Sequence, residues 1–428
     1  MAQATLYGRM SRNIGWLLGG KALGGLLSLV YLAVAARLLG PYQFGVFAIV
    51  LSFGQAIANL IQFQSSQLVI RFGAAHLHGM MPDRFTALLR FSALLDIGSA
   101  VASAAIGFLF AGLCGRLFGW SGDIVEGAQW FSLSLVFWLR ATPTGVLRLL
   151  DRFDRLTLAE TLTPMIRFAG AVAALAMPPS MTVFLVIWAI SEAAASLLLW
   201  MFARSALRRE GVAMSPGWPR RVTAENPGLW RFALASNATA STNLVWQQLG
   251  TLAVGAVVGT AAAGGYRIAF QIAQALAKPA MLLGRVIYPE LARLGAAGNA
   301  GPAVWRSTAM AGIGGVAMVA LTLLAGEPAL ALIAGAPYAA AGVILTILSI
   351  SAAIDLAGFA LEPALLAAGR AGHALIARIG GAIVYAGLLL FSIDRWGVHG
   401  VAWSAVAGSL AALVLSLLLV RRAGVRGA

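Results

Sequence analysis

Four basic residues of the chain lie within apolar stretches, where a charge is energetically unfavourable. Lys21, Arg140, Arg167 and Lys278 each fall inside a long apolar stretch rather than between two stretches. A charged side chain near the centre of a bilayer costs roughly 2.5 to 3.5 kcal/mol on insertion scales, so such residues are usually kept for a function. Lysine and arginine donors suit phosphate. We therefore interpret the four as candidate ligands of an anionic substrate, with snorkelling toward the interface as the alternative for Lys21 and Arg140.

Five acidic residues also fall inside the apolar stretches, at Asp96, Glu160, Glu192, Asp355 and Glu362. A carboxylate in such a position can neutralise a buried cation, or it can titrate during an ion-coupled cycle. Both interpretations stay open at this point. We retain Asp96, Glu192 and Asp355 as ion-coupling candidates.

Amide side chains gather in two other apolar stretches. The segment "SNATASTNLVWQQ" contains Asn237, Asn243 and Gln247, and an earlier stretch contains Gln55 and Asn59. Facing lipid, these groups would lack hydrogen-bond partners. We expect them to line a wet cavity, with hydrogen bonding between helices as the alternative.

The composition requires membrane-spanning elements to carry these residues. Hydrophobic residues make up 60% of the chain and charged residues 11%, whereas soluble domains have roughly 25% charged residues. Apolar runs near 20 residues recur throughout, and each is long enough to cross a bilayer as an α-helix. The sequence therefore predicts an all-α polytopic membrane protein. Its predicted spans, about twelve, lie near residues 14–37, 44–70, 86–111, 128–148, 156–177, 181–203, 229–257, 265–289, 303–325, 339–365, 375–393 and 398–420.

The longest connection divides these spans into two equal sets. Residues 204–228 contain five arginines and three prolines, so we expect a six-helix half over 1–203, a basic cytoplasmic linker, and a second half over 229–428. Both halves begin on the same side of the membrane, which predicts two parallel repeats around a central cavity. A short likeness agrees with this: "LGPYQFGVFAIVLSFGQ" (39–55) and "VGTAAAGGYRIAFQIAQ" (258–274) align Gly40 with Gly259 and Gly45 with Gly264. Chance similarity between two glycine-rich turns is the alternative.

The net charge of +15 is explained by the loops. Arginines concentrate in alternate connections, and only Arg37, Arg116, Arg267 and Arg395 fall on the opposite side. By the positive-inside rule both termini are predicted to be cytoplasmic. The charge therefore requires no nucleic-acid partner.

The segments "ARLLGPYQFGVFAIVLS" and "AGAPYAAAGVILTILSISAAID", the twelve spans and the basic central loop resemble Wzx-type flippases. These form the polysaccharide transporter branch of the multidrug, oligosaccharidyl-lipid and polysaccharide exporter superfamily. The resemblance implies a MATE-like fold in the bacterial inner membrane, with no cofactor. It also implies that the chain flips an undecaprenyl-pyrophosphate-linked oligosaccharide to the periplasmic leaflet by alternating access, for surface polysaccharide such as O-antigen, lipopolysaccharide or exopolysaccharide. Membrane lipid, a polysaccharide polymerase and a chain-length regulator are the further partners implied.

Two other functions are the alternatives to a flippase. A small-molecule or multidrug efflux antiporter of the same fold usually carries cationic or neutral substrates, which would favour an acidic rather than a basic interior. A membrane-embedded glycan polymerase or glycosyltransferase would need a sizeable external loop with carboxylates, but Asp123 and Glu126 form the only external acidic pair. The four histidines are scattered and predict no metal site.

Overall fold

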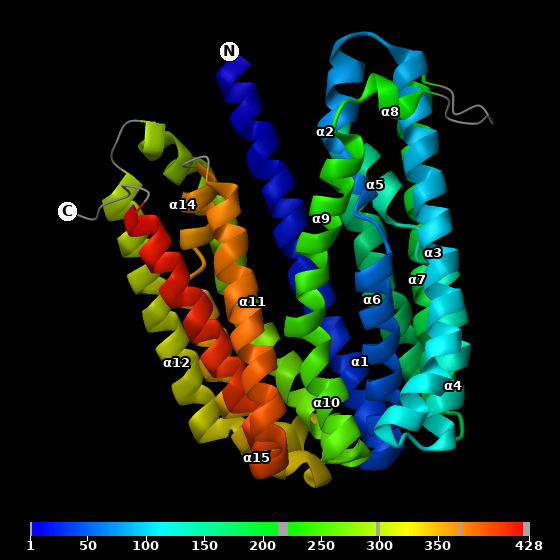
Figure 1. Ribbon diagram of the computed structural model, residues 1–428, viewed down its shortest axis with the longest axis vertical. Coiled ribbons are helices and arrows are strands. Elements are labelled where there is room, and N and C mark those ends of the chain that lie inside the picture. Colours follow the sequence, from blue (N-terminus) through cyan, green and yellow to red (C-terminus); the bar gives the residue numbers. More distant parts are fainter. Residues whose placement is uncertain (1, 213–220, 297–299, 368–369, 423–428) are drawn as a thin grey trace. The chain divides into compact units, whose positions relative to one another are not determined.

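The computed structural model describes residues 2–212, 221–296, 300–367 and 370–422. Side chains are described from Leu23 onward, except at 78, 239, 243, 279–304, 307, 363, 366–369 and 371. Throughout these ranges the backbone forms helices joined by short connections, without a strand (Figure 1).

Six stretches of the described chain are long and apolar enough to cross a membrane. The first and the last contain 55 and 51 residues, and a single crossing needs about 20. Each of these two can therefore supply two crossings. The predicted all-α polytopic membrane fold is confirmed, whereas the count of twelve spans stays a prediction. The six stretches are Leu23–Leu77, Pro82–Phe118, Met181–Arg209, Thr308–Ala334, Ala336–Ala357 and Gly372–Arg422.

The two longest helices are each interrupted at a glycine. In α1 (Ala2–Ile61) the backbone leaves the helical region at Gly40, with φ 69° and ψ 174°, directly before Pro41. In α15 (Ala371–Arg422) the same happens at Gly397. A positive φ is accessible to glycine without the penalty that a β-carbon brings. Both interruptions fall where the sequence predicted a turn, in "LGPYQFG" and "DRWG".

The chain divides into two compact units. Unit 1 comprises Met1–Tyr31 and Val50–Leu244. Its core includes the buried side chains of Val69, Leu89, Leu147 and Leu199, which come from four different helices. Besides parts of α1 it contains α2 (Ser65–His78), α3 (Pro82–Phe118), α4 (Gly122–Leu133), the 3₁₀ helix η1 (Ser134–Phe137), α5 (Ala141–Leu149), α6 (Phe153–Ala174), α7 (Met181–Arg209), α8 (Val222–Glu225) and α9 (Leu229–Leu244).

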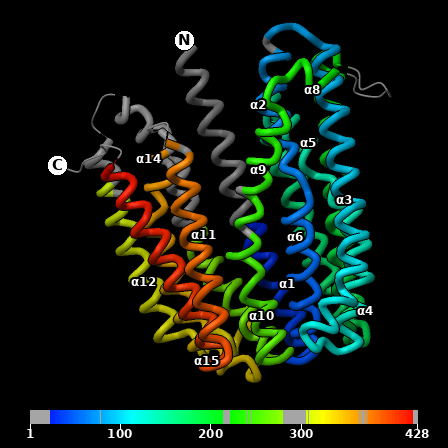
Figure 2. Tube along the Cα trace, viewed as in Figure 1, coloured from blue at the N-terminus to red at the C-terminus, as the bar shows by residue number. Residues whose placement is uncertain are grey.

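Unit 2 comprises Leu32–Ile49 of α1 and the chain from Val245 onward. At its centre α13 packs against α11, α12 and α15, whose paths can be followed in Figure 2. Its elements are the π-helical turn η2 (Val245–Leu249), α10 (Gly250–Val257), α11 (Thr260–Ala296), α12 (Ala300–Ala334), the 3₁₀ helix η3 (Ala336–Ala341), α13 (Gly342–Ala357), α14 (Leu361–Ala367) and α15.

The two segments that are alike in sequence meet inside unit 2. Gly40 and Gly259 both have positive φ, at 69° and 127°. Five residues after each, the chains touch: a β-carbon on Gly264 would lie 3.1 Å from the amide nitrogen of Gly45. The likeness between the segments therefore extends to backbone conformation and to mutual packing.

We expect Gly45→Ala to destabilise the protein. A β-carbon on Gly45 would overlap the backbone carbonyl oxygen of Thr260, and overpacking of this kind typically costs about 1 to 3 kcal/mol. The matched control is Gly25→Ala, because no atom lies within 4 Å of a β-carbon there. Thermal unfolding of both variants in detergent measures the difference. Equal melting temperatures for the two variants would contradict the close packing.

Candidate functional site

Two helices of unit 1 are broken within their apolar stretches. The first break, residues 62–64, separates α1 from α2, and the second, residues 138–140, separates η1 from α5. The side-chain amide of Gln62 donates a hydrogen bond to the backbone oxygen of Leu135 at 3.5 Å, so the two breaks lie close together. Irregular backbone at membrane depth is tolerated only where it is buried in protein or lines a cavity. Broken helices of this kind surround substrate sites in many transporter folds.

Side chains of α9 bind carbonyl groups at the end of α1. The backbone oxygen of Asn59 accepts a hydrogen bond from the Ser241 hydroxyl at 3.3 Å. The oxygen of Leu60 accepts one from the Asn237 amide at 3.4 Å. The last carbonyls of a helix have no partner within the helix. The polar residues of α9 therefore help to stabilise the first break.

A carboxylate from another helix stabilises the second break. Oδ2 of Asp96, on α3, accepts a hydrogen bond from the backbone N–H of Thr142 in the first turn of α5, at 2.8 Å. A negative charge is stabilising at a helix N-terminus. Asp96 thus binds the start of α5, and its predicted role in ion coupling stays a prediction.

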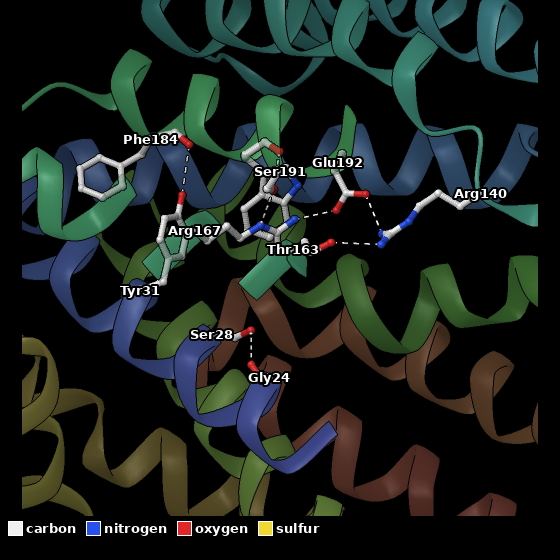
Figure 3. A network of polar contacts seen from close by, with 10 residues as sticks. Gly24, Ser28, Tyr31, Arg140, Thr163, Arg167, Phe184, Ser191 and Glu192 are labelled. Atoms are coloured by element: carbon white, nitrogen blue, oxygen red, sulfur yellow. Dashed lines mark hydrogen bonds and ion pairs between the residues drawn. The ribbon is translucent and has the colours of Figure 1, made fainter. Parts of the chain in front are cut away.

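Arg140 and Arg167, which the sequence proposed separately, share one carboxylate (Figure 3). Nη1 of Arg140 lies 2.7 Å from Oε2 of Glu192. Nη2 of Arg167 lies 2.6 Å from Oε1 of the same residue. Arg140 also donates to the Thr163 hydroxyl at 3.1 Å. We call Arg140, Glu192 and Arg167 the arginine–glutamate network.

Two further side chains contact the guanidinium group of Arg167. Its Nε donates to the hydroxyl of Ser191 at 2.9 Å. Its guanidinium carbon lies 3.3 Å from the ring centre of Trp188, a stacked cation–π arrangement. The same ring lies 6.2 Å from that of Tyr31. Such contacts fix the orientation of a buried guanidinium.

The network carries a net positive charge, and its Arg140 side chain is partly exposed. Two guanidinium groups face one carboxylate, so their formal sum is +1. The side chains of Arg167 and Glu192 are only 10% and 8% exposed, whereas that of Arg140 is 30% exposed. Arg140 also stands at the second helix break, directly before α5. It is therefore the member of the network that can accept a further anionic partner.

Ser191, Thr163 and Trp188 were not identified from the sequence. A signal for two of them existed, because Trp188 lies four residues before Glu192 on α7 and Thr163 lies four residues before Arg167 on α6. Residues spaced by three or four share one face of a helix. Ser191 is adjacent to Glu192, so this spacing does not single it out.

One of the two remaining predicted cations, Lys278, lies in unit 2 and outside this network. Lys278 is exposed on α11, and none of the ion pairs of the described chain involves it. Arg267, which the sequence assigned to the opposite side of the membrane from most arginines, is buried in α11, with 4% exposure. It donates to the backbone oxygen of Gln247 at 3.3 Å and to Oε1 of Gln248 at 3.2 Å. Its side of the membrane stays a prediction.

Other predicted residues are dispersed over both units. Asp355, on α13, lies beside Ser409 and interacts electrostatically with Arg378. Gln55 and Asn59 are half-buried on α1. Lys21 and Asn243 lie on α1 and α9, and their side chains are outside the described residues.

Comparison with known proteins identifies a family and a relative of this chain. Residues 10–294 match the family model described as "Polysaccharide biosynthesis protein". The chain is 30% identical over 332 residues to the inner membrane protein YghQ of Escherichia coli (strain K12), covering 76% of this chain and 93% of that protein.

Two solved structures share the fold at low sequence identity. An inward-facing multidrug resistance MATE family transporter of the MOP superfamily superposes with a TM-score of 0.75 at 16% identity, over 93% of this chain and 94% of that one. The lipid II flippase MurJ in an inward closed conformation gives 0.75 at 13% identity, over 94% and 86%. Both neighbours are transporters or flippases rather than enzymes.

Proposed function

The chain belongs to the polysaccharide biosynthesis protein family, and from this premise we propose that it is a flippase for a lipid-linked oligosaccharide. The cargo is an undecaprenyl-pyrophosphate glycan. It moves from the cytoplasmic to the periplasmic leaflet of a bacterial inner membrane, by alternating access, during the synthesis of a surface polysaccharide. Both termini of the chain lie in the cytoplasm, as the distribution of arginines favours.

The observation that carries the proposal is the surplus charge of the arginine–glutamate network. A pyrophosphate is anionic, and a guanidinium can bind it with two parallel, charge-assisted hydrogen bonds. Arg140 is half-buried, is oriented by Glu192 and Thr163, and stands at a helix break. Glu192 thus keeps the network stable without cargo, while Arg140 retains donors for a phosphate.

The fold by itself does not separate this proposal from drug efflux, since the MATE transporter and MurJ superpose equally well. The charge of the network favours the flippase over drug efflux. A cationic drug would be repelled by a site with a formal charge of +1, whereas an anionic lipid head would be attracted. We therefore propose an anionic cargo for this chain.

The proposal is tested in the native host by deleting the gene and extracting its lipids. We expect an undecaprenyl-pyrophosphate glycan to accumulate, measured by mass spectrometry, and surface polysaccharide to decrease. Both changes should be reversed when the wild-type gene is restored. Unchanged lipid and surface glycan in the deletion strain would contradict the proposal.

A further inference from the structure

One face of α7 passes from apolar residues to arginines near its end. Val186, Ile190, Leu197 and Met201 are 49%, 54%, 65% and 57% exposed. They recur at spacings of four and seven, so they lie along one face of the helix. On a spanning helix this exposed apolar face contacts lipid chains.

Three arginines continue that face toward the C-terminal end of α7. Arg204, Arg208 and Arg209 are exposed, and the helix ends at Arg209. Arg204 follows Met201 by three residues and Arg208 follows it by seven, which keeps them on the same side. The arginines therefore lie where the lipid-facing surface reaches the level of the head groups, within about 12 Å of Met201 along the helix axis.

Arg204, Arg208 and Arg209 line a cavity of about 450 Å³ that is largely open to the surface, together with Met201 and Ser205. The Ser205 hydroxyl accepts a hydrogen bond from Arg155 of α6 at 3.3 Å. No carboxylate of the described chain lies within 4.0 Å of Arg204, Arg208 or Arg209, because its ion pairs involve other arginines. The cavity thus concentrates positive charge that no carboxylate of the described residues neutralises in an ion pair.

We propose that this cavity binds the phosphate group of an anionic phospholipid. The guanidinium groups bind the phosphate, and an acyl chain lies along the exposed apolar face of α7. Charge complementarity supplies the attraction, and a basic pocket at the membrane interface is suited to an anionic head group. This site is separate from the arginine–glutamate network, because Glu192 lies on the buried side of α7. It does not depend on the identity of the transported cargo.

The test uses the full-length purified protein and native mass spectrometry. The protein is equilibrated with mixed micelles containing phosphatidylglycerol or phosphatidylcholine, and the number of retained lipids is counted. We expect phosphatidylglycerol to be retained preferentially, and the triple variant R204Q/R208Q/R209Q to retain several-fold less of it. The matched control is R421Q/R422Q, which removes two exposed arginines at the end of α15 and should leave retention unchanged.

A lysine triple variant and competition with inorganic phosphate complete the test. The triple variant R204K/R208K/R209K preserves the charge and should restore most of the retention, even if the glutamine variant folds poorly. Equal retention of phosphatidylglycerol by the wild type and a folded glutamine variant would overturn the proposal. Displacement of the lipid by millimolar inorganic phosphate would also overturn it, since the cavity would then be a site for free phosphate.

Discussion

Replacing Glu192 with glutamine is expected to lower the stability of the protein more than any other single charge change in unit 1. The carboxylate is 8% exposed and bridges Arg140 and Arg167 at 2.7 and 2.6 Å. Without it, the buried guanidinium of Arg167 loses its counter-ion. Breaking a buried ion pair from one side typically costs about 3 to 5 kcal/mol. The measurement is the thermal unfolding temperature in detergent.

A second ion pair of unit 1 provides the matched control. Glu225 lies 3.9 Å from Arg84, and their side chains are 26% and 50% exposed. Exposed pairs contribute about 0 to 1 kcal/mol, so Glu225→Gln should change the unfolding temperature little. The double variant Glu192→Gln/Arg167→Gln should be less destabilised than the sum of the single variants, because it removes the unpaired charge as well. Additive effects would show that the two groups do not interact as the structure describes.

Replacing Arg140 with glutamine is expected to abolish most of the transport while the protein stays folded. Arg167 and Glu192 still pair in this variant, so little stability should be lost. A hydrogen bond to a charged group contributes about 1.5 to 3 kcal/mol, which corresponds to a ten- to hundredfold weaker interaction with a phosphate. Arg140→Lys should retain part of the activity, because an ammonium keeps the charge but not the fork of donors.

The control for this prediction lies on the short helix that follows Arg140. Arg148 is exposed near the end of α5, eight residues after Arg140, and it belongs to no ion pair of the described chain. Arg148→Gln therefore removes the same charge from a neighbouring position without touching the network. Complementation of the deletion strain by Arg148→Gln but not by Arg140→Gln is the expected result. Complementation by both variants would exclude Arg140 as a cargo ligand.

Much of the fold could be predicted from the sequence because apolar run length and turn residues act locally. The turn at Gly40 is marked by a glycine beside a proline. The turn at Gly397 is marked by a glycine that follows two charged residues and a tryptophan. The helix breaks were harder to predict. Gln62 and Gln64 mark the first one, but a polar run inside a span can equally line a cavity.

The sequence signal for the second break is ambiguous without the structure. Pro143 is the third residue of α5, and proline is tolerated in the first turn of a helix, where its missing N–H is not needed. The same proline could also have marked a kink in one continuous helix. The choice depends on Asp96, which comes from another helix and binds the N–H of Thr142.

The sequence identified the individual residues of the candidate site but not the contacts between them. Arg140, Arg167 and Glu192 each stand out as charges in apolar spans, since burial makes charges conspicuous in a sequence. That the two arginines share one carboxylate depends on how α6 and α7 pack beside the second break, which no local pattern specifies. For Glu192 the sequence left two roles open, neutralising a buried cation or ion coupling. Its contacts place it between two cations, and a role in ion coupling stays a prediction.

The most direct measurement of the central claim is flipping by the purified protein in sealed vesicles. The vesicles contain an undecaprenyl-pyrophosphate oligosaccharide, and an enzyme or lectin added outside reports the fraction of glycan exposed over time. The account predicts that the wild-type protein and Arg148→Gln both accelerate exchange between leaflets, and that Arg140→Gln does so at least about tenfold more slowly. Exchange at the rate of protein-free vesicles with the wild type, or at the wild-type rate with Arg140→Gln, would contradict it.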